Sequence, residues 1–545
     1  MVDKIKVVIV GGGSAGWMTA SFLSEALAEG VDISLIESGT IRMIGVGEAT
    51  FSDIHLFFEF LGLHEEDWMP QCNASYKVAI RFVDWNAERR RFYHPFQRFE
   101  LVQGRRIVEW WLKLKKDSIP ADYACFTVPR ICDAQLSPRY MDGRAFDSRI
   151  DGHLGPSKTG DKAVLMEDLH LQYPYAYHFD ASLLARFLSG YAKKRGVRQI
   201  VDDVVDVRLT ENGSIESVRT KENGEIKGDL FIDCTGFQGL LINQVLKEPF
   251  ISYADSLPCD RAIAMQVPSD RKKDGVNPFT TATALSSGWV WDIPLFHRVG
   301  TGYVYSSAFL SPEDAEREYR QHLGARAEDC NAAHIKMRVG RNRNSWVRNC
   351  VAIGLSSGFV EPLESTGIFF IHHAIEQLVN YFPGKHYDEK NVKSYNSVVG
   401  NCMDGVREFL TLHYVASTRE DTKFWKATKH ELVIPDELAE RLKLWESRLP
   451  TERTINPNYH EFPAYSYCVM LLGLGRQPKQ SLPLLNHVRD GEALSAFEQI
   501  RKRTDYLLAT LPLLGDYLTE RYGDGEPKPA RSARNDSVAA SVEQA

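Results

Sequence analysis

The sequence predicts an α/β fold in which a sheet-rich module comes first and a mainly helical portion follows. Residues 4–37 alternate as strand, helix and strand, which is the pattern of a parallel βαβ unit. From about residue 385 the apolar spacing becomes helical and the chain more polar. We therefore expect the sheet-rich module over residues 1–384 and the helical portion over residues 385–523. Residues 524–545 consist mainly of Gly, Pro, Ser, Ala and charged residues without an apolar period, and they predict a disordered tail.

The composition is that of a globular protein without an obligate nucleic-acid partner. The 545 residues include 65 Lys and Arg against 72 Asp and Glu, a formal net charge of −7, and no basic stripe stands out. The longest apolar run, Ile368–Ile371, is too short to cross a bilayer. The chain begins with a strand rather than a signal peptide, so a cytoplasmic location is the default expectation. The nine cysteines form no CxxC pair and indicate neither disulfides nor a metal site.

The elements of the sheet-rich module can be placed in order. Residues Ile5–Val10 form a short buried strand, and the apolar spacing after Ser14 predicts a helix that stops at Gly30. Asp32–Glu37 is the second strand. Later strands are expected within Gly228–Gly236 and Val351–Gly354, followed by a helix from about Gly367 to Phe382.

A glycine-rich loop joins the first strand to the first helix. Gly11 permits the tight turn, Gly13 lets backbone approach a pyrophosphate, and Gly16 lets helix and strand pack closely. Free N–H groups at the start of the helix favour phosphate, and Glu37, about 20 residues after Gly16, is placed to bind ribose hydroxyls. This pattern predicts a Rossmann-like nucleotide site, which by itself does not separate FAD from NAD. The predicted residues are Gly11, Gly13, Ser14, Ala15, Gly16 and Glu37.

The segment Tyr76–Phe82 predicts a single strand with a lysine near its start. A period of two puts Tyr76, Val78, Ile80 and Phe82 on one face, and it puts Lys77 on the other with Ala79 and Arg81. From this pattern alone, Lys77 is an exposed lysine on a strand.

The string Trp289-Val290-Trp291-Asp292-Ile293-Pro294 predicts an aromatic strand stopped by proline. Together with the glycine loop, it resembles the flavin-dependent halogenases, and in particular their tryptophan-halogenating branch. Further segments that carry the resemblance are Gly45–Thr50, Tyr76–Phe82, Tyr93–Phe96, His178–Ala181, Gly340–Arg343 and Phe359–Gly367. Within the branch, the chain resembles the subgroup that acts at C5 or C6. The similarity to that subgroup lies in Phe51-Ser52, Glu109-Trp110-Trp111, the long segment between Gly143 and Tyr177, and the short stretch Tyr459–Tyr467.

The resemblance implies an enzyme with a flavin monooxygenase-type FAD-binding fold, of the kind found in antibiotic biosynthesis. Reduced FAD and O₂ would turn chloride or bromide into hypohalous acid, which would travel through the protein and halogenate free L-tryptophan at C5 or C6. No second dinucleotide motif stands out, so a separate NAD(P)H-dependent flavin reductase would supply the reduced FAD. A homodimer is expected, without a metal, a membrane or a nucleic acid.

The resemblance also implies roles for individual residues. Lys77 would hold hypohalous acid or carry the halogen, and Glu364 would orient the halogen and take the ring proton. Thr366 and Gly367 would bind halide. The expected flavin contacts include Gly47, Glu48, Ala49, Thr50, Trp289, Trp291 and Gly354, and the two tryptophans would also keep organic substrates from the flavin. The expected substrate-pocket residues are Phe51, Ser52, His94, Pro95, Phe96, Gln172, Tyr175, Ser365, Phe462 and Tyr465.

Plainer interpretations and other functions stay open at this point. Without the resemblance, Glu364 is an acid at a helix entry and Thr366 is a helix cap. A flavin-dependent aromatic monooxygenase is an alternative function, as are a halogenase of another indole or larger aromatic substrate and a flavin-binding protein without catalysis. The triplet Phe462-Pro463-Ala464 mixes patterns of the subgroup, so both C5 and C6 remain candidates for the ring position.

Overall fold

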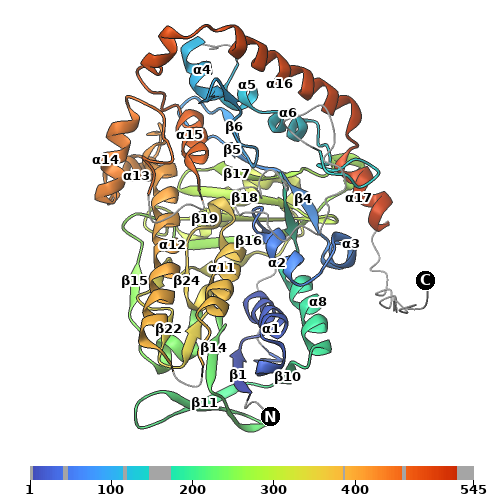
Figure 1. The fold of residues 1–545 in the computed structure, drawn as a ribbon, viewed down its shortest axis with the longest axis vertical. Coiled ribbons are helices and arrows are strands. Elements are labelled where there is room, and N and C mark those ends of the chain that lie inside the picture. Colours follow the sequence, from blue (N-terminus) through green and yellow to red (C-terminus); the bar gives the residue numbers. More distant parts are fainter. Residues whose placement is uncertain are drawn as a thin grey trace, which may run out of the picture.

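Two sheets form the centre of the protein (Figure 1). The computed structural model describes residues 4–40, 47–114, 119–146, 174–384, 387–456 and 462–523. The predicted tail, 524–545, lies outside the described residues. None of the helices in these ranges combines the length and the apolar run needed to cross a membrane.

A six-stranded sheet contains the predicted βαβ unit. Its strand order is β10 (Arg198–Val201), β2 (Val31–Glu37), β1 (Ile5–Val10), β14 (Leu230–Asp233), β23 (Cys350–Ala352) and β22 (Trp346–Val347). All neighbouring strands are parallel except β22 and β23. The strands predicted for this sheet and the two helices predicted beside it are confirmed, with ends shifted by a few residues.

Each face of this sheet packs against a different layer. Successive strand residues point to opposite faces, so Val7 and Ile9 pack on one side while Val8 and Val10 pack on the other. The first side is covered by α1 (Ser14–Ala26), α8 (Ala181–Lys194) and α11 (Gly367–Asn380). The second side is covered by the small antiparallel sheet of β11 (Val204–Leu209), β12 (Ile215–Thr220) and β13 (Gly224–Lys227).

A seven-stranded sheet carries the tryptophan string. Its order is β20 (Ala333–Lys336), β16 (Arg261–Pro268), β19 (Arg298–Tyr305), β18 (Gly288–Pro294), β17 (Phe279–Ala284), β5 (Ala79–Val83) and β6 (Arg91–Pro95). The string is therefore an inner strand, β18, that ends at Pro294 as predicted. One face packs against the C-terminal half of the long helix α12 (Glu389–Val415), through Val406, Phe409 and Leu410.

The predicted strand Tyr76–Phe82 is in fact two strands. The first, β4 (Ser75–Lys77), pairs with β9 (Ala176–Phe179), whereas β5 belongs to the seven-stranded sheet. Between them, Val78 donates its backbone N–H to the carbonyl of Pro278, which interrupts the strand. Tyr76 and Val78 consequently pack in the core beside the six-stranded sheet, while Ile80 and Phe82 pack with Trp289. The expectation that these four side chains share a face is wrong.

The helices at the end of the molecule far from the N-terminus come from two parts of the chain (Figure 1). The early helices α4 (Ile107–Leu114), α5 (Ala121–Cys125) and α6 (Val128–Asp133) contact the late helices α15 (Ala464–Gly473) and α16 (Gly491–Thr510). The helical portion therefore includes residues before 385. The other elements used below are α2 (Ile54–Phe60), β3 (Glu48–Ala49) and α17 (Leu514–Tyr522).

Candidate functional site

The glycine loop between β1 and α1 has the geometry of a phosphate cradle. Gly11 has φ +115°, and a Cβ there would lie 2.2 Å from the carbonyl oxygen of Cys234. A Cβ on Gly16 would lie 1.8 Å from the carbonyl oxygen of Gly11. Helix α1 starts directly after Gly13, which provides no side-chain cap, so the first N–H groups of the helix are available to an anion.

Two other predicted residues border this loop. The Glu37 carboxylate accepts a hydrogen bond from the Trp17 indole (3.2 Å) and another from the Gln199 amide, and it lies against Gly12. Gly354 approaches the start of α1 so closely that a Cβ on it would lie 2.8 Å from the Cβ of Ala15. These residues fit a dinucleotide whose pyrophosphate meets the start of α1 and whose ribose meets Glu37.

The described part of the predicted strap, Gly47–Thr50, runs beside β9. Glu48 and Ala49 form β3, which pairs with Phe179 and His178, and Thr50 donates both its N–H and its hydroxyl to the Tyr177 carbonyl. Burial, and then the negative charge of Asp180, raise the pKa of Glu48 to about 7. Residues Gly45 and Val46 of the motif lie outside the described ranges.

Lys77 is fully buried at the end of β4, with an exposed fraction of 0%. Its Nζ donates to the Thr50 carbonyl (2.9 Å) and to the Ser365 hydroxyl (2.8 Å), and it lies 5.1 Å from the centre of the Phe96 ring. Burial lowers the pKa of Lys77 to about 7, against the opposing effect of the nearby Glu364 charge. The exposed position expected from the strand pattern alone is wrong, because the strand breaks after Lys77 and the side chain enters the interior.

Glu364 lies at the end of a short 3₁₀ turn, Pro362–Glu364, and is also buried. Its carboxylate oxygens are 3.1 and 3.2 Å from Nδ1 of His94, and Oε1 is 2.8 Å from Nε2 of His413. Burial raises the pKa of Glu364, but the two histidines outweigh it and lower the pKa to about 2. The carboxylate is therefore ionised near neutral pH.

The two residues predicted to bind halide, Thr366 and Gly367, follow Glu364 and Ser365 in the chain. Ser365 has a left-handed backbone (φ 63°), Thr366 is the N-cap of α11, and Gly367 is its first residue. The Thr366 hydroxyl is buried without a hydrogen-bond partner in the described residues, and so is the hydroxyl of Ser52. Uncapped N–H groups and an unpaired hydroxyl at the start of a 14-residue helix fit a small anion.

Aromatic side chains line the region beside Glu364. The Phe51 ring lies 5.0 Å from Phe369 and 5.6 Å from Phe462, which stacks on Phe409 at 4.2 Å. His94 is 5.9 Å from the Tyr465 ring. Pro95 and Phe96 follow His94 at the end of β6, with Phe96 under Lys77. The structure thus brings predicted substrate residues from four segments to the lysine and the glutamate.

The two tryptophans of β18 are buried with their ring centres 6.3 Å apart. Trp289 donates its indole N–H to Oε2 of Glu361 (3.1 Å), which also accepts from the Tyr414 hydroxyl. The other oxygen of Glu361 accepts the backbone N–H of Cys259 at 3.2 Å. Burial raises the pKa of Glu361 to about 7, although these donors lower it in part.

One predicted substrate residue, Tyr175, is not brought to this region. Gln172 lies outside the described residues. The Tyr175 hydroxyl donates to Glu65 (2.9 Å) beside Arg139, and the hydroxyl of Tyr76 reaches the same carboxylate. Because neighbouring strand residues face opposite ways, Tyr175 lies on the Tyr76 side of β4 and away from Lys77.

Sequence reasoning missed His413 and the partners of Glu361. A single histidine inside a long helix carries no motif, and only the fold brings His413 to Glu364. In the sequence, Glu361 is recognisable only as an acidic residue close to the start of a helix.

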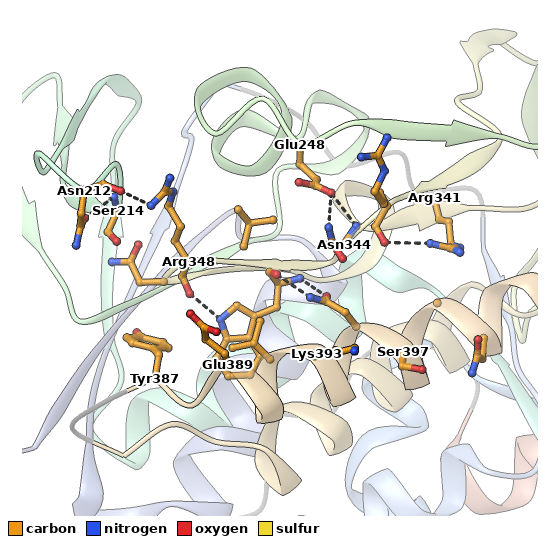
Figure 2. A pocket seen from close by; sticks show the side chains of 18 residues that line it. Asn212, Ser214, Glu248, Arg341, Asn344, Arg348, Tyr387, Glu389, Lys393 and Ser397 are labelled. Atoms are coloured by element: carbon orange, nitrogen blue, oxygen red, sulfur yellow. Dashed lines mark hydrogen bonds between the residues drawn. The ribbon is translucent and has the colours of Figure 1, made fainter.

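A polar groove of about 840 Å³ lies elsewhere on the molecule (Figure 2). It is bordered by the first half of α12 and by residues 341–349, and Figure 2 shows Arg348 bonded to Asn212 and Glu248 bonded to Asn344. Lys393 and Ser397 face it from α12, at least 16 residues or roughly 24 Å of helix before His413. None of the predicted site residues lines it.

The chain is similar to known proteins over nearly its whole length. The sequence profile of the tryptophan halogenase family matches residues 6–152 and 156–490. Tryptophan 6-halogenase SttH of Streptomyces toxytricini is 52% identical over 515 residues, 94% of this chain and 97% of that protein. The 7-chloro-L-tryptophan 6-halogenase KtzR of Kutzneria sp. (strain 744) is 51% identical over 518 residues, 95% of this chain and 99% of that protein. The solved structure of Tar14, a tryptophan C-6 flavin-dependent halogenase (chlorinase) from taromycin biosynthesis, matches with a TM-score of 0.89 and 51% identity, covering 95% of this chain and 100% of that one.

Proposed function

The chain belongs to the tryptophan halogenase family, and we propose that it halogenates the indole ring of free L-tryptophan at C6 with reduced FAD, O₂ and chloride or bromide. The observation that carries this proposal is the buried 2.8 Å contact between Lys77 and Ser365. It joins the lysine to the segment that holds Glu364, Thr366 and Gly367. C6 is chosen over C5 because SttH, KtzR and Tar14 are all named for C6.

The nucleotide cradle and the lysine site have separate tasks in this proposal. Halide and indole are both nucleophiles, so the halogen has to reach the ring as an electrophile. Bound reduced FAD supplies the electrons with which O₂, halide and a proton become hypohalous acid and water. The loop Gly11–Gly16 and the start of α1 would hold its pyrophosphate, Glu37 its ribose, and Gly47–Thr50 with Gly354 the rest. Trp289 and Trp291 would keep the organic substrate away from the flavin, which leaves halide to react there.

Lys77 provides the amine that takes up the halogen. Because its pKa is lowered to about 7, a large fraction is neutral amine near pH 7. A neutral amine has two N–H groups, which Thr50 and Ser365 accept, and one lone pair, which stays free. Attack of this lone pair on hypohalous acid forms the nitrogen–halogen bond and breaks the halogen–oxygen bond. The released hydroxide takes a proton from the nitrogen and leaves as water.

Glu364 completes the substitution as a general base. Transfer of the halogen forms the carbon–halogen bond and breaks the nitrogen–halogen bond, and the pair of electrons of that bond stays on the lysine nitrogen. The Glu364 carboxylate takes the proton lost from the ring carbon and passes it on to the lysine nitrogen, so the amine and the carboxylate are both regenerated and protons balance over the step. A positioned carboxylate of this kind also stabilises the positive charge of the ring before the proton leaves.

The test is an aerobic assay with FAD, a flavin reductase, NADH, NaCl or NaBr, and tryptophan, with products identified by mass spectrometry and NMR. We expect monohalogenated tryptophan substituted at C6, and none from Lys77→Ala or from Lys77→Arg, since a guanidinium stays charged. Lys393→Ala, in the distant groove, is the matched control and should retain full activity. A hydroxylated product without halide dependence would instead identify an aromatic monooxygenase.

Two substrates have to be compared in the same assay. The name of KtzR raises 7-chlorotryptophan as an alternative to tryptophan itself. A kcat/KM for 7-chlorotryptophan at least tenfold above that for tryptophan would reassign the substrate. Conversion of neither, with flavin bound, would direct the search to a panel of other indoles and larger aromatics.

The supply of reduced FAD and the assembly state are part of the same proposal. Free diffusion of reduced flavin from a separate reductase predicts that an unrelated reductase supports the reaction equally well at equal flavin supply. A homodimer predicts twice the chain mass of 61.8 kDa in light scattering.

A further inference from the structure

Histidine rings approach the Glu364 carboxylate from two sides. His94 comes from β6 and His413 from α12, and both rings are buried, with exposed fractions of 2% and 0%. Their nitrogens lie 3.1 Å and 2.8 Å from the carboxylate oxygens. The second ring nitrogen has different neighbours in the two histidines. These neighbours determine whether each ring carries one proton or two.

His413 is held between two groups that only accept hydrogen bonds. Its Nδ1 is 2.8 Å from the backbone carbonyl oxygen of Phe409, one turn earlier in α12, and its Nε2 is 2.8 Å from Oε1 of Glu364. A carbonyl cannot donate, so Nδ1 must carry a proton. A neutral ring would then present a lone pair at Nε2 to a carboxylate oxygen at 2.8 Å, which is repulsive. A second proton therefore lies between His413 and Glu364.

His94 does not have this constraint. Its Nδ1 faces both oxygens of Glu364, while its Nε2 is buried with no hydrogen-bond partner in the described residues. One proton on Nδ1 satisfies the carboxylate and leaves Nε2 as a lone pair, so a neutral ring is sufficient.

The surroundings place the shared proton on the imidazole rather than on the carboxylate. Besides the two histidines, the ionisable groups that act on Glu364 are Lys77 from β4 and Tyr465 from α15. The rings of Phe82, Trp85 and Phe409 also lie around the His413 ring. Two N–H donors on Glu364 favour its ionised form, and the ion pair keeps both groups buried at no net charge.

We propose that His413 is a positioning residue, an imidazolium that neutralises Glu364 and thereby leaves Lys77 without a counter-charge, as a neutral amine. This inference rests on the proposed function, in which the amine of Lys77 takes up the halogen. If His413 were neutral, Lys77 and Glu364 would form the ion pair instead. An ammonium has no lone pair and cannot react with hypohalous acid. His413 would then act on the reaction through Lys77 and Glu364, without touching the substrate.

The first test measures protons directly and does not depend on catalysis. In protein labelled with ¹⁵N-histidine, NMR at pH 7.5 should show one ring with both nitrogens protonated that disappears in His413→Gln. In Glu364→Gln the same ring should become neutral with the proton on Nδ1, which assigns the signal even if His413→Gln does not fold. A neutral His413 in the otherwise unchanged protein would overturn the inference while leaving the halogenase function untouched.

The second test is the pH profile of turnover. In His413→Gln the amide can still donate to Glu364, but the carboxylate keeps its full charge and stabilises the ammonium of Lys77. We expect the rise of kcat with pH to move to higher pH by about one unit, which lowers kcat about tenfold on the acidic side, with KM for tryptophan changed less than about twofold. His94→Gln, whose amide can also donate to Glu364, should move the midpoint less than His413→Gln does. Equal loss of kcat at every pH in His413→Gln would indicate a purely structural role and contradict the inference.

Discussion

Glu361 and Glu364 stand three positions apart, are both buried, and differ in charge behaviour because their neighbours differ. The donors to Glu361 in the described part of the chain are neutral, namely Trp289, Tyr414 and both the backbone N–H and the thiol of Cys259, and burial raises its pKa to about 7. Glu364 is equally deep, yet His94 and His413 lower its pKa to about 2. The comparison shows that burial alone does not set the state of an acid. The chemistry of the donors around it lets one carboxyl take up a proton near neutral pH and keeps the other ionised.

Replacing each acid by its amide should separate these two roles most strongly. Glu364→Gln removes the base, so we expect kcat for tryptophan halogenation to fall about 10³-fold with little change in KM. Glu361→Gln keeps an oxygen that can accept from Trp289, so kcat should fall less than about tenfold. The measurement is the steady-state kinetics of the two variants at an equal supply of reduced flavin. Similar losses in both would contradict the division of roles.

The stability of the protein should depend on Glu361 in its own range of pH. The folded-state pKa of about 7 is above the ordinary value of 4.5, so the folded protein binds the proton more tightly than the unfolded chain. The contribution is complete below pH 4.5 and is lost as pH rises through about 7, by up to about 3 kcal/mol in the free energy of unfolding. Urea unfolding of the parent protein and Glu361→Gln from pH 5 to 8 isolates this term. A constant difference between the two would show that Glu361 is not protonated in the fold.

The bond between Trp289 and Glu361 should be measurable as a coupling. Trp289→Phe leaves one fewer donor on the buried carboxyl, and a double-mutant cycle with Glu361→Ala, which removes the acceptor, should give a coupling energy of about 1 kcal/mol in unfolding experiments. Trp291→Phe is the control, because the Trp291 indole N–H has no partner in the described residues. Equal coupling for both tryptophans would mean that ring packing, rather than the hydrogen bond, joins Trp289 to Glu361.

The smallest effect is expected at the residue that connects Glu364 to the lysine. Ser365→Ala removes one of the two acceptors of the Lys77 amine, and we expect about a fivefold loss of kcat, corresponding to about 1 kcal/mol. The structure of the loop should not change, because alanine can also adopt the backbone at this position at small cost. Undiminished kcat in Ser365→Ala would show that the Thr50 carbonyl alone positions the amine.

Local patterns predicted four strands of the six-stranded sheet, β1, β2, β14 and β23, and the lysine site only in part. The loop Gly11–Gly16 is formed by consecutive residues, so the spacing of its glycines in the sequence is enough to predict its shape. The site around Glu364 joins residues 270 and 49 positions away, and the role of Lys77 came from family resemblance. The alternation of Tyr76–Phe82 failed because a backbone bond from Val78 to Pro278, 200 residues away, interrupts the strand. Contacts between residues so far apart in the chain produce no periodic pattern in the sequence.

The position of His413 in the chain also has a consequence for biosynthesis. During translation, Lys77 and His94 are synthesised long before Glu364. His413 is synthesised later than Glu364, by 49 residues. Until α12 has emerged, burying Glu364 beside Lys77 would join the acid to an ammonium rather than to an imidazolium. Of the charged groups in this cluster, the imidazolium proposed for His413 is therefore the last to be synthesised, and it reaches Glu364 only when α12 has docked.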